Sequence, residues 1–149
     1  PPHRKGTLMK WIYDDGGRQA AGFKGSTGDC ACRAIAIATG QAYRTVYDGL
    51  NSTSKSEKPR KGRRRSSSRT GVTRKTCAAY LAADGWTWVP TMQIGSGCRV
   101  HMRRDELPPG KLIVRVSKHL AAVVDGVVYD THDPSRDGSR CVYGYWQKS

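Results

Sequence analysis

The clearest helical pattern in the chain covers residues 30–39. This stretch is rich in Ala and Ile and contains neither Gly nor Pro, and Gly40 follows it as a stop signal. Cys30 lies in the first turn on one apolar face of the predicted helix, and Cys32 points roughly the other way. Candidate N-cap oxygens precede the helix on Ser26, Thr27 and Asp29.

Two further helices and a short strand are expected in the same half of the chain. A strand at residues 10–13 comes first, and a second helix is expected over residues 43–50. A third helix, capped by Thr73, extends through residue 83 and ends at Gly85.

The last third of the chain has the pattern of antiparallel strands. The pair Asp125 and Gly126 forms the favoured two-residue turn of a β-hairpin. Helices followed by a run of antiparallel strands indicate an α+β fold, and 149 residues suit a single domain over 1–149. The predicted strands cover residues 86–92, 111–116, 119–124, 127–131 and 141–146.

The hairpin turn fixes which residues face each other. A two-residue turn pairs Val124 with Val127, so His119 and Asp130 become diagonal neighbours on one face of the hairpin. A carboxylate beside an imidazole fixes its tautomer and stabilises its cation, as a catalytic base requires. Asp133 points to the other face unless a bulge intervenes, and the alternative interpretation is a surface His beside a surface Asp.

The five cysteines predict free thiols rather than a disulfide framework. An odd number in a chain of this length fits a reducing, cytoplasmic compartment. Cys30 lies where the helix N-terminus favours a thiolate, although Asp29 next to it opposes this, and the alternative is a plain buried cysteine. The spacing of Cys98 and His101 resembles that of zinc ligands, but a second matching motif is missing, so we expect neither a metal nor another cofactor.

Positive charge is concentrated in one segment of the chain. The net charge is +14, and residues 55–75 hold ten Lys or Arg against one acid, Glu57. We predict a mobile basic insertion at 52–70, because such a composition cannot bury enough apolar surface to fold alone. Three interpretations stay open: a solvated loop, a site for nucleic acid or another polyanion, and a site for an acidic protein substrate. The cations proposed to bind a polyanion are Lys58, Arg60, Lys61, Arg63, Arg64, Arg65 and Arg69.

The composition also argues against several classes of protein. No apolar run approaches the roughly 20 residues that span a bilayer, so we expect no membrane partner. We also expect no secretion signal, because no charged and then apolar leader precedes the body of the chain.

Two segments resemble the papain-like cysteine peptidase superfamily. Residues 28–36, GDCACRAIA, resemble the nucleophile helix of OTU-type deubiquitinases, whose Asp-Gly-Asn-Cys-x-x-Arg-Ala pattern is matched at Cys30, Arg33 and Ala34. Residues 118–131, KHLAAVVDGVVYDT, resemble the strand that carries the histidine in the same superfamily. Asp133 followed by Pro resembles the ending of bacteriocin-processing peptidases. As a whole, the chain most resembles bacterial and phage proteins with the same helix-then-hairpin pair.

The resemblance implies a fold and an activity. It implies a nucleophile helix packed on a C-terminal antiparallel sheet, and a peptidase or isopeptidase acting on peptide or protein, including ubiquitin-like, substrates in a bacterial or phage-infected cell. Cys30 would be the nucleophile, His119 the base, and Asp130, or else Asp133, the orienting acid. The chain has no Gln or Asn where papain-like enzymes carry an oxyanion-binding Gln, so Ser26, Thr27 and loop amides would form the oxyanion hole. The alternative is a non-catalytic basic binding module on the same scaffold.

Overall fold

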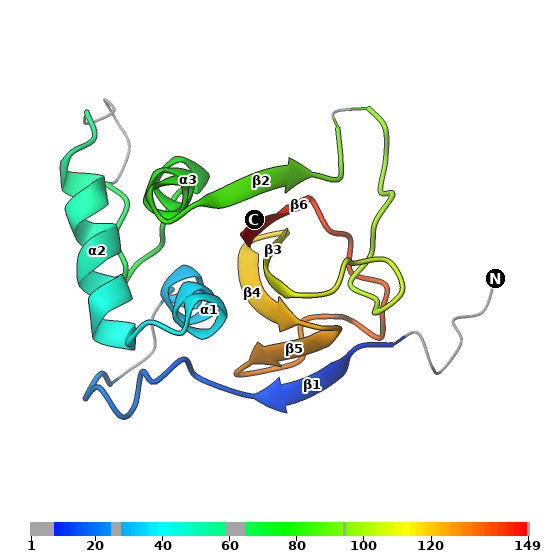
Figure 1. Cartoon of the computed structure of the whole chain (residues 1–149), viewed down its shortest axis with the longest axis horizontal. Coiled ribbons are helices and arrows are strands. Elements are labelled where there is room, and N and C mark those ends of the chain that lie inside the picture. The colour runs from blue at the N-terminus through cyan, green and yellow to red at the C-terminus, as the bar shows by residue number, and fades with distance from the viewer. Residues whose placement is uncertain (1–7, 25–27, 59–64, 94, 149) are drawn as a thin grey trace.

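The computed structural model describes residues 8–24, 28–58, 65–93 and 95–148 of the 149-residue chain. This described part is an α+β arrangement of three helices and one six-stranded mixed sheet (Figure 1). The elements in chain order are β1 (Lys10–Tyr13), α1 (Cys30–Thr39), α2 (Tyr43–Lys55), α3 (Arg74–Ala83), β2 (Trp86–Pro90), β3 (Lys111–Val116), β4 (His119–Val124), β5 (Val127–Asp130) and β6 (Gly144–Lys148).

The strands follow the order β1-β5-β4-β3-β6-β2 across the sheet. Neighbouring strands from β5 to β2 are antiparallel, as predicted for the last third of the chain. The first strand departs from the expected antiparallel sheet, because β1 pairs with β5 in a parallel sense. Parallel neighbours need a long crossover connection, and all three helices lie in the chain between these two strands.

Helix α1 lies between the sheet and α2 (Figure 1). Its small Ala side chains allow close packing against β4, and Cys32 is buried on the side that faces α2, where its thiol donates to the Tyr43 carbonyl at 3.7 Å. The helix ends at Gly40, whose φ of 74° is the left-handed conformation predicted for a C-cap. A second apolar cluster, which includes Met102 and Leu107, packs with residues of β3, β4 and β5. Among the described residues, no helix has the length and apolar character needed to cross a bilayer.

Three predicted element boundaries are wrong by several residues. The second helix continues past residue 50 to Lys55, because Ser54 is buried and its hydroxyl donates to the Ser66 carbonyl at 2.5 Å. The strand predicted over 86–92 ends at Pro90, and the last strand begins at Gly144 instead of residue 141.

Both ends of the predicted basic insertion pack against the domain. Residues 52–55 belong to α2, and Ser66 and Ser68 are buried. The Ser68 hydroxyl donates to the Tyr47 carbonyl at 2.6 Å, and the Gly28 amide donates to the Arg69 carbonyl at 2.9 Å. Residues 59–64 lie outside the described residues, so the predicted mobility there stays a prediction.

The structure describes some of the cations that are predicted to bind a polyanion, and the others lie outside the described residues. Lys58, Arg65 and Arg69 are exposed, and one guanidinium nitrogen of Arg65 also donates to the Ser54 carbonyl at 2.6 Å. Four of the predicted cations lie outside the described residues, namely Arg60, Lys61, Arg63 and Arg64.

The prediction that all five cysteines are free is wrong for two of them. Cys98 and Cys141 form a disulfide with their Cα atoms 5.8 Å apart, and Cys30, Cys32 and Cys77 are free thiols. The Val142 amide donates to the Val100 carbonyl at 2.8 Å, and this contact holds the two disulfide segments side by side. The cysteines lie 43 residues apart, and no sequence pattern pairs them.

Candidate active site

Cys30 is the first residue of α1 and lies half-buried against β4. The first hydrogen bond of the helix runs from the Arg33 amide to the Asp29 carbonyl, so the Cys30 amide lies in the unpaired first turn. Burial raises the pKa of the thiol, but a hydrogen bond with His119 and the charge of that ring outweigh burial. The Leu120 backbone and the Arg33 charge act in the same direction, and the pKa falls below its ordinary value of 9.0.

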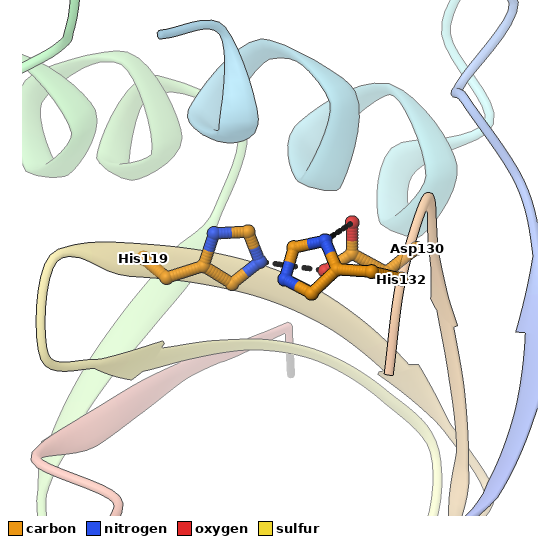
Figure 2. A group of neighbouring side chains, drawn as sticks. All are labelled: His119, Asp130 and His132. Carbon is orange, nitrogen blue, oxygen red and sulfur yellow. Dashed lines mark hydrogen bonds and ion pairs between the residues drawn. The ribbon is translucent and has the colours of Figure 1, made fainter. Parts of the chain in front are cut away.

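The predicted contact between His119 and Asp130 is present. The structure confirms the pairing of Val124 with Val127, so the first residue of β4 and the last residue of β5 meet at the open end of the hairpin. The Nε2 atom of His119 is 2.6 Å from Oδ2 of Asp130 (Figure 2). Because Nε2 is engaged with the carboxylate, Nδ1 is the ring nitrogen that remains for the thiol of Cys30.

Electrostatics of the His119 and Asp130 pair favour the charged form of both groups. Burial lowers the pKa of His119, but its hydrogen bonds to Asp130 and Cys30 and their charges raise it to about 9. Burial raises the pKa of Asp130, whereas the His119 bond and charge, the Thr131 amide and His132 bring it below its ordinary value. Together with the lowered pKa of Cys30, these shifts favour a thiolate–imidazolium pair oriented by a carboxylate.

A buried ionic network lies next to Cys30, and no sequence pattern predicts it. The Asp29 carboxylate is 2% exposed and forms no N-cap hydrogen bond. It forms an ion pair with Arg33, lies 3.2 Å from Nε of Arg18, and accepts a 2.6 Å hydrogen bond from the Tyr43 hydroxyl. Asp29 is therefore neutralised by two guanidinium groups, which offsets its expected opposition to a thiolate.

The other residues predicted at the site lie elsewhere or outside the described part. Asp133 accepts hydrogen bonds from the amide and hydroxyl of Ser135, at 3.0 and 2.7 Å, so it is engaged in a local turn. The candidate oxyanion residues Ser26 and Thr27 lie outside the described residues.

His132 forms the exposed side of the group. Its ring centroid is 5.0 Å from that of His119, and its Nδ1 is 4.0 Å from Oδ1 of Asp130 (Figure 2). In the described part of the chain, His119, Asp130 and His132 are the one group whose ligand atoms are close enough for a metal ion, within 4.8 Å of one another. Two of these residues already share a short hydrogen bond, and the Arg33 guanidinium lies 3.7 Å from Asp130 and would repel a cation. We therefore interpret His119 and Asp130 as a hydrogen-bonded pair, with the exposed His132 ring beside it.

Comparisons with protein-family models, with curated proteins and with solved structures returned no match to this chain. The geometry places three groups in series: the Cys30 thiol at a helix N-terminus, the His119 imidazole that lowers the pKa of that thiol, and the buried Asp130 carboxylate that is hydrogen-bonded to the imidazole. This order of groups is suited to nucleophilic catalysis by Cys30.

Proposed function

We propose that the protein is a cysteine hydrolase, of the peptidase or isopeptidase type, that acts through a thioester on Cys30. One observation carries the proposal: the His119 ring is 2.6 Å from the Asp130 carboxylate, and the same ring interacts with the Cys30 thiol and lowers its pKa. Each interaction has a separate use, because the contact with the thiol allows proton transfer and the contact with the carboxylate orients the ring and stabilises its cation.

The reaction proceeds in two halves. The Cys30 thiolate attacks the carbonyl carbon, and a C–S bond forms while the carbonyl π electrons move to oxygen. When the tetrahedral intermediate collapses, the C–N bond breaks, and the His119 imidazolium gives its proton to the leaving amine. In the second half, His119 takes a proton from water, the resulting hydroxide attacks the thioester, and the C–S bond breaks to release the acid and restore the thiolate.

The developing oxyanion requires hydrogen-bond donors near Cys30. The Cys30 amide lies in the first turn of α1, where the helix dipole also favours negative charge. We assign this amide as one donor and keep Ser26 and Thr27, or the amides of their loop, as the proposed second contribution.

A papain-like architecture is the finer fold that accompanies this proposal. The order of a Cys at a helix start, a His at the start of a later strand and an acid at the end of the next strand supports it. The substrate class follows from the resemblance: peptide or isopeptide bonds of proteins, including ubiquitin-like ones. The reducing, cytoplasmic location also stays a proposal, and the three free thiols support it, whereas the Cys98–Cys141 disulfide points the other way.

The decisive test uses p-nitrophenyl acetate, a simple acyl donor that needs no peptide recognition. A burst of nitrophenolate measures acylation of the thiol. We expect Cys30→Ala and His119→Ala each to reduce the burst rate at least 100-fold, and the double variant to be no worse, because the two residues act as one unit. Cys32→Ala, a change in the same helix, should keep the burst.

Iodoacetamide labelling of the native protein provides a second readout. Cys30 should react first, because Cys32 and Cys77 are buried and burial raises the pKa of each to about 12. Near-normal acylation in His119→Ala, or first labelling of another cysteine, would contradict the proposed function. A protein that shows no burst but binds nucleic acid would favour the binding-module alternative.

A further inference from the structure

The Arg33 guanidinium lies between two buried carboxylates from different parts of the fold. Its Nη1 forms an ion pair with Oδ1 of Asp29, at the N-cap of α1. Its Nη2 is 3.7 Å from Oδ1 of Asp130, at the end of β5. Arg33 therefore connects the helix that begins with Cys30 to the carboxylate that holds His119.

Helix geometry makes this connection direct. Arg33 follows Cys30 by three residues, a little less than one turn, and follows Asp29 by four, so all three lie at the same end of α1. The Arg33 side chain is 14% exposed, and the side chains of Asp29 and Asp130 are 2% and 4% exposed. Burial of this degree makes the charges interact strongly, since little water screens them.

Neighbouring elements enclose the guanidinium network on two further sides. Arg18, in the segment after β1, and the Tyr43 hydroxyl of α2 both contact Oδ2 of Asp29. The backbone of Gly16 packs on Arg33 so closely that a Cβ there would lie 3.0 Å from the Arg33 carbonyl oxygen. The negative charges of the two carboxylates, Asp29 and Asp130, equal the positive charges of the two guanidinium groups, Arg18 and Arg33. The network is therefore neutral when Cys30 and His119 are left out of the sum.

We propose that Arg33 is a positioning residue for the reaction at Cys30. Its contacts hold Asp130 against the helix that begins with Cys30, so that Asp130, His119 and Cys30 keep their relative positions. Its positive charge also balances the negative charge of Asp130. This inference rests on the proposed function, and it adds a role for a residue that touches neither the substrate nor the sulfur.

Loss of Arg33 has two separable consequences. Asp130 would keep the Thr131 amide, at 2.7 Å, and His119, but it would lose its link to α1. The site would also gain one uncompensated negative charge, which disfavours a thiolate. The charged and titratable groups around Cys30 are His119 on β4, Asp130 on β5, Cys77 on α3, and Asp29 and Arg33 at the start of α1.

The experiment compares Arg33→Gln and Arg33→Lys with the parent protein. The rate constant for alkylation of Cys30 by iodoacetamide is measured against pH, and kcat and KM are measured for p-nitrophenyl acetate. Arg33→Gln should shift the alkylation profile to higher pH by about one unit, which lowers the rate about tenfold on its rising side. Arg33→Lys should keep the alkylation profile, because the charge remains. The kcat of Arg33→Lys should still fall while its KM stays unchanged, because a single ammonium group cannot replace a planar guanidinium group that contacts two carboxylates.

Arg44→Gln is the matched control. Arg44 also forms an ion pair with a carboxylate four residues away on a helix, at 3.2 Å to Asp48, but its side chain is 67% exposed, where water screens the charge. This variant should leave both readouts unchanged. Reduced thermal stability alone in the Arg33 variants, with both readouts at the parent values, would overturn the inference.

The outcomes separate this inference from the proposed function. If Arg33→Gln does not fold, the test rests on Arg33→Lys. A kcat of Arg33→Lys equal to that of the parent protein would then reject the positioning role of Arg33. If the parent shows no acylation at all, the proposed function fails. In that case, a shifted alkylation profile in Arg33→Gln would still support the effect of Arg33 on the thiol, and an unshifted one would reject it.

Discussion

The interactions of the His119 ring with Asp130 and with Cys30 determine which form the Cys30 thiol takes. An imidazole that contacted only the thiol would be buried and would tend to lose its proton. Asp130 reverses this tendency, because its carboxylate accepts a hydrogen bond from Nε2 at 2.6 Å. The nearby Arg33 charge and the Thr131 amide stabilise the ionised form of this carboxylate. The imidazolium then stabilises the thiolate.

The pH dependence of acylation follows from these shifts. Activity should rise with pH as the Cys30 thiolate forms, at a pH below the ordinary pKa of a cysteine thiol. It should fall again as His119 loses its proton near pH 9. We predict that Asp130→Asn moves the falling limb to lower pH by roughly 1 unit or more, because an amide cannot stabilise the imidazolium. The measurement is kcat/KM for p-nitrophenyl acetate between pH 5 and about 10.

A second variant serves as the control for that shift. Asp133→Asn changes a carboxylate three residues along the chain that is bonded to Ser135, so its falling limb should coincide with that of the parent. A falling limb that moves in Asp133→Asn and stays in place in Asp130→Asn would give the orienting role to Asp133.

At this scale, the sequence predicted contacts within one hairpin better than contacts between distant segments. The register placed His119 beside Asp130, because an Asp-Gly turn leaves little freedom in the pairing. The partners of Asp29 were not predictable, since Arg18 and Tyr43 come from separate elements and no spacing rule relates them to α1. Arg33 belongs to the motif that begins at Cys30, but its contact with Asp130 depends on how α1 packs on the sheet.

At the scale of elements, the turn between β4 and β5 controls the geometry of the site. Asp125 and Gly126 have φ values of 49° and 79°, which is the pattern of a type I′ turn. The Asp125 carboxylate also accepts a 2.7 Å hydrogen bond from the Gly110 amide, which fixes the turn against the loop before β3. A slip of one residue would move His119 and Asp130 to opposite faces.

We predict that Gly126→Ala lowers the free energy of unfolding by about 1–2 kcal/mol, because a Cβ is unfavourable at this φ. Asp125→Asn should be nearly neutral, since Asn suits the same turn and can keep the bond from Gly110. Urea unfolding of both variants tests this. Equal stability of the parent and Gly126→Ala would show that the turn does not require glycine.

Elements with clear end signals were predicted well, and those without them were not. Thr73 caps α3 as expected, with its hydroxyl accepting from the Thr76 amide at 3.3 Å, and Gly40 ends α1. Polar residues 51–55 of α2 carry no helical signal and are helical because tertiary contacts bury Ser54. Cys141 lies outside β6 because the disulfide and the bridge to His101 hold it against another loop.

At the scale of the whole molecule, the basic segment and the nucleophile helix are neighbours. The Gly28 amide, two residues before Cys30, is bonded to the Arg69 carbonyl, and a Cβ on Gly28 would lie 2.9 Å from the Thr70 carbonyl oxygen. Gly28 and Arg69 are 41 residues apart in the sequence, with α1 and α2 between them, so sequence spacing does not predict this contact. The segment that supports Gly28 therefore has to be kept when the role of the charge is tested.

The last prediction removes the charge and keeps the backbone. Five cations are changed to Gln, namely Lys58, Arg60, Lys61, Arg63 and Arg64. Arg65, whose guanidinium donates to the Ser54 carbonyl, and Arg69, whose backbone carbonyl accepts from the Gly28 amide, are left unchanged. Each phosphate contact contributes roughly 0.9 to the log–log salt slope for duplex DNA, so loss of five contacts should flatten the slope by about 4.5. Affinity for a duplex is measured from low to moderate salt for the parent and the variant, together with acylation of Cys30. Parallel slopes would show that the segment is solvated charge, and a loss of acylation at an unchanged slope would mean that these cations serve the active site instead.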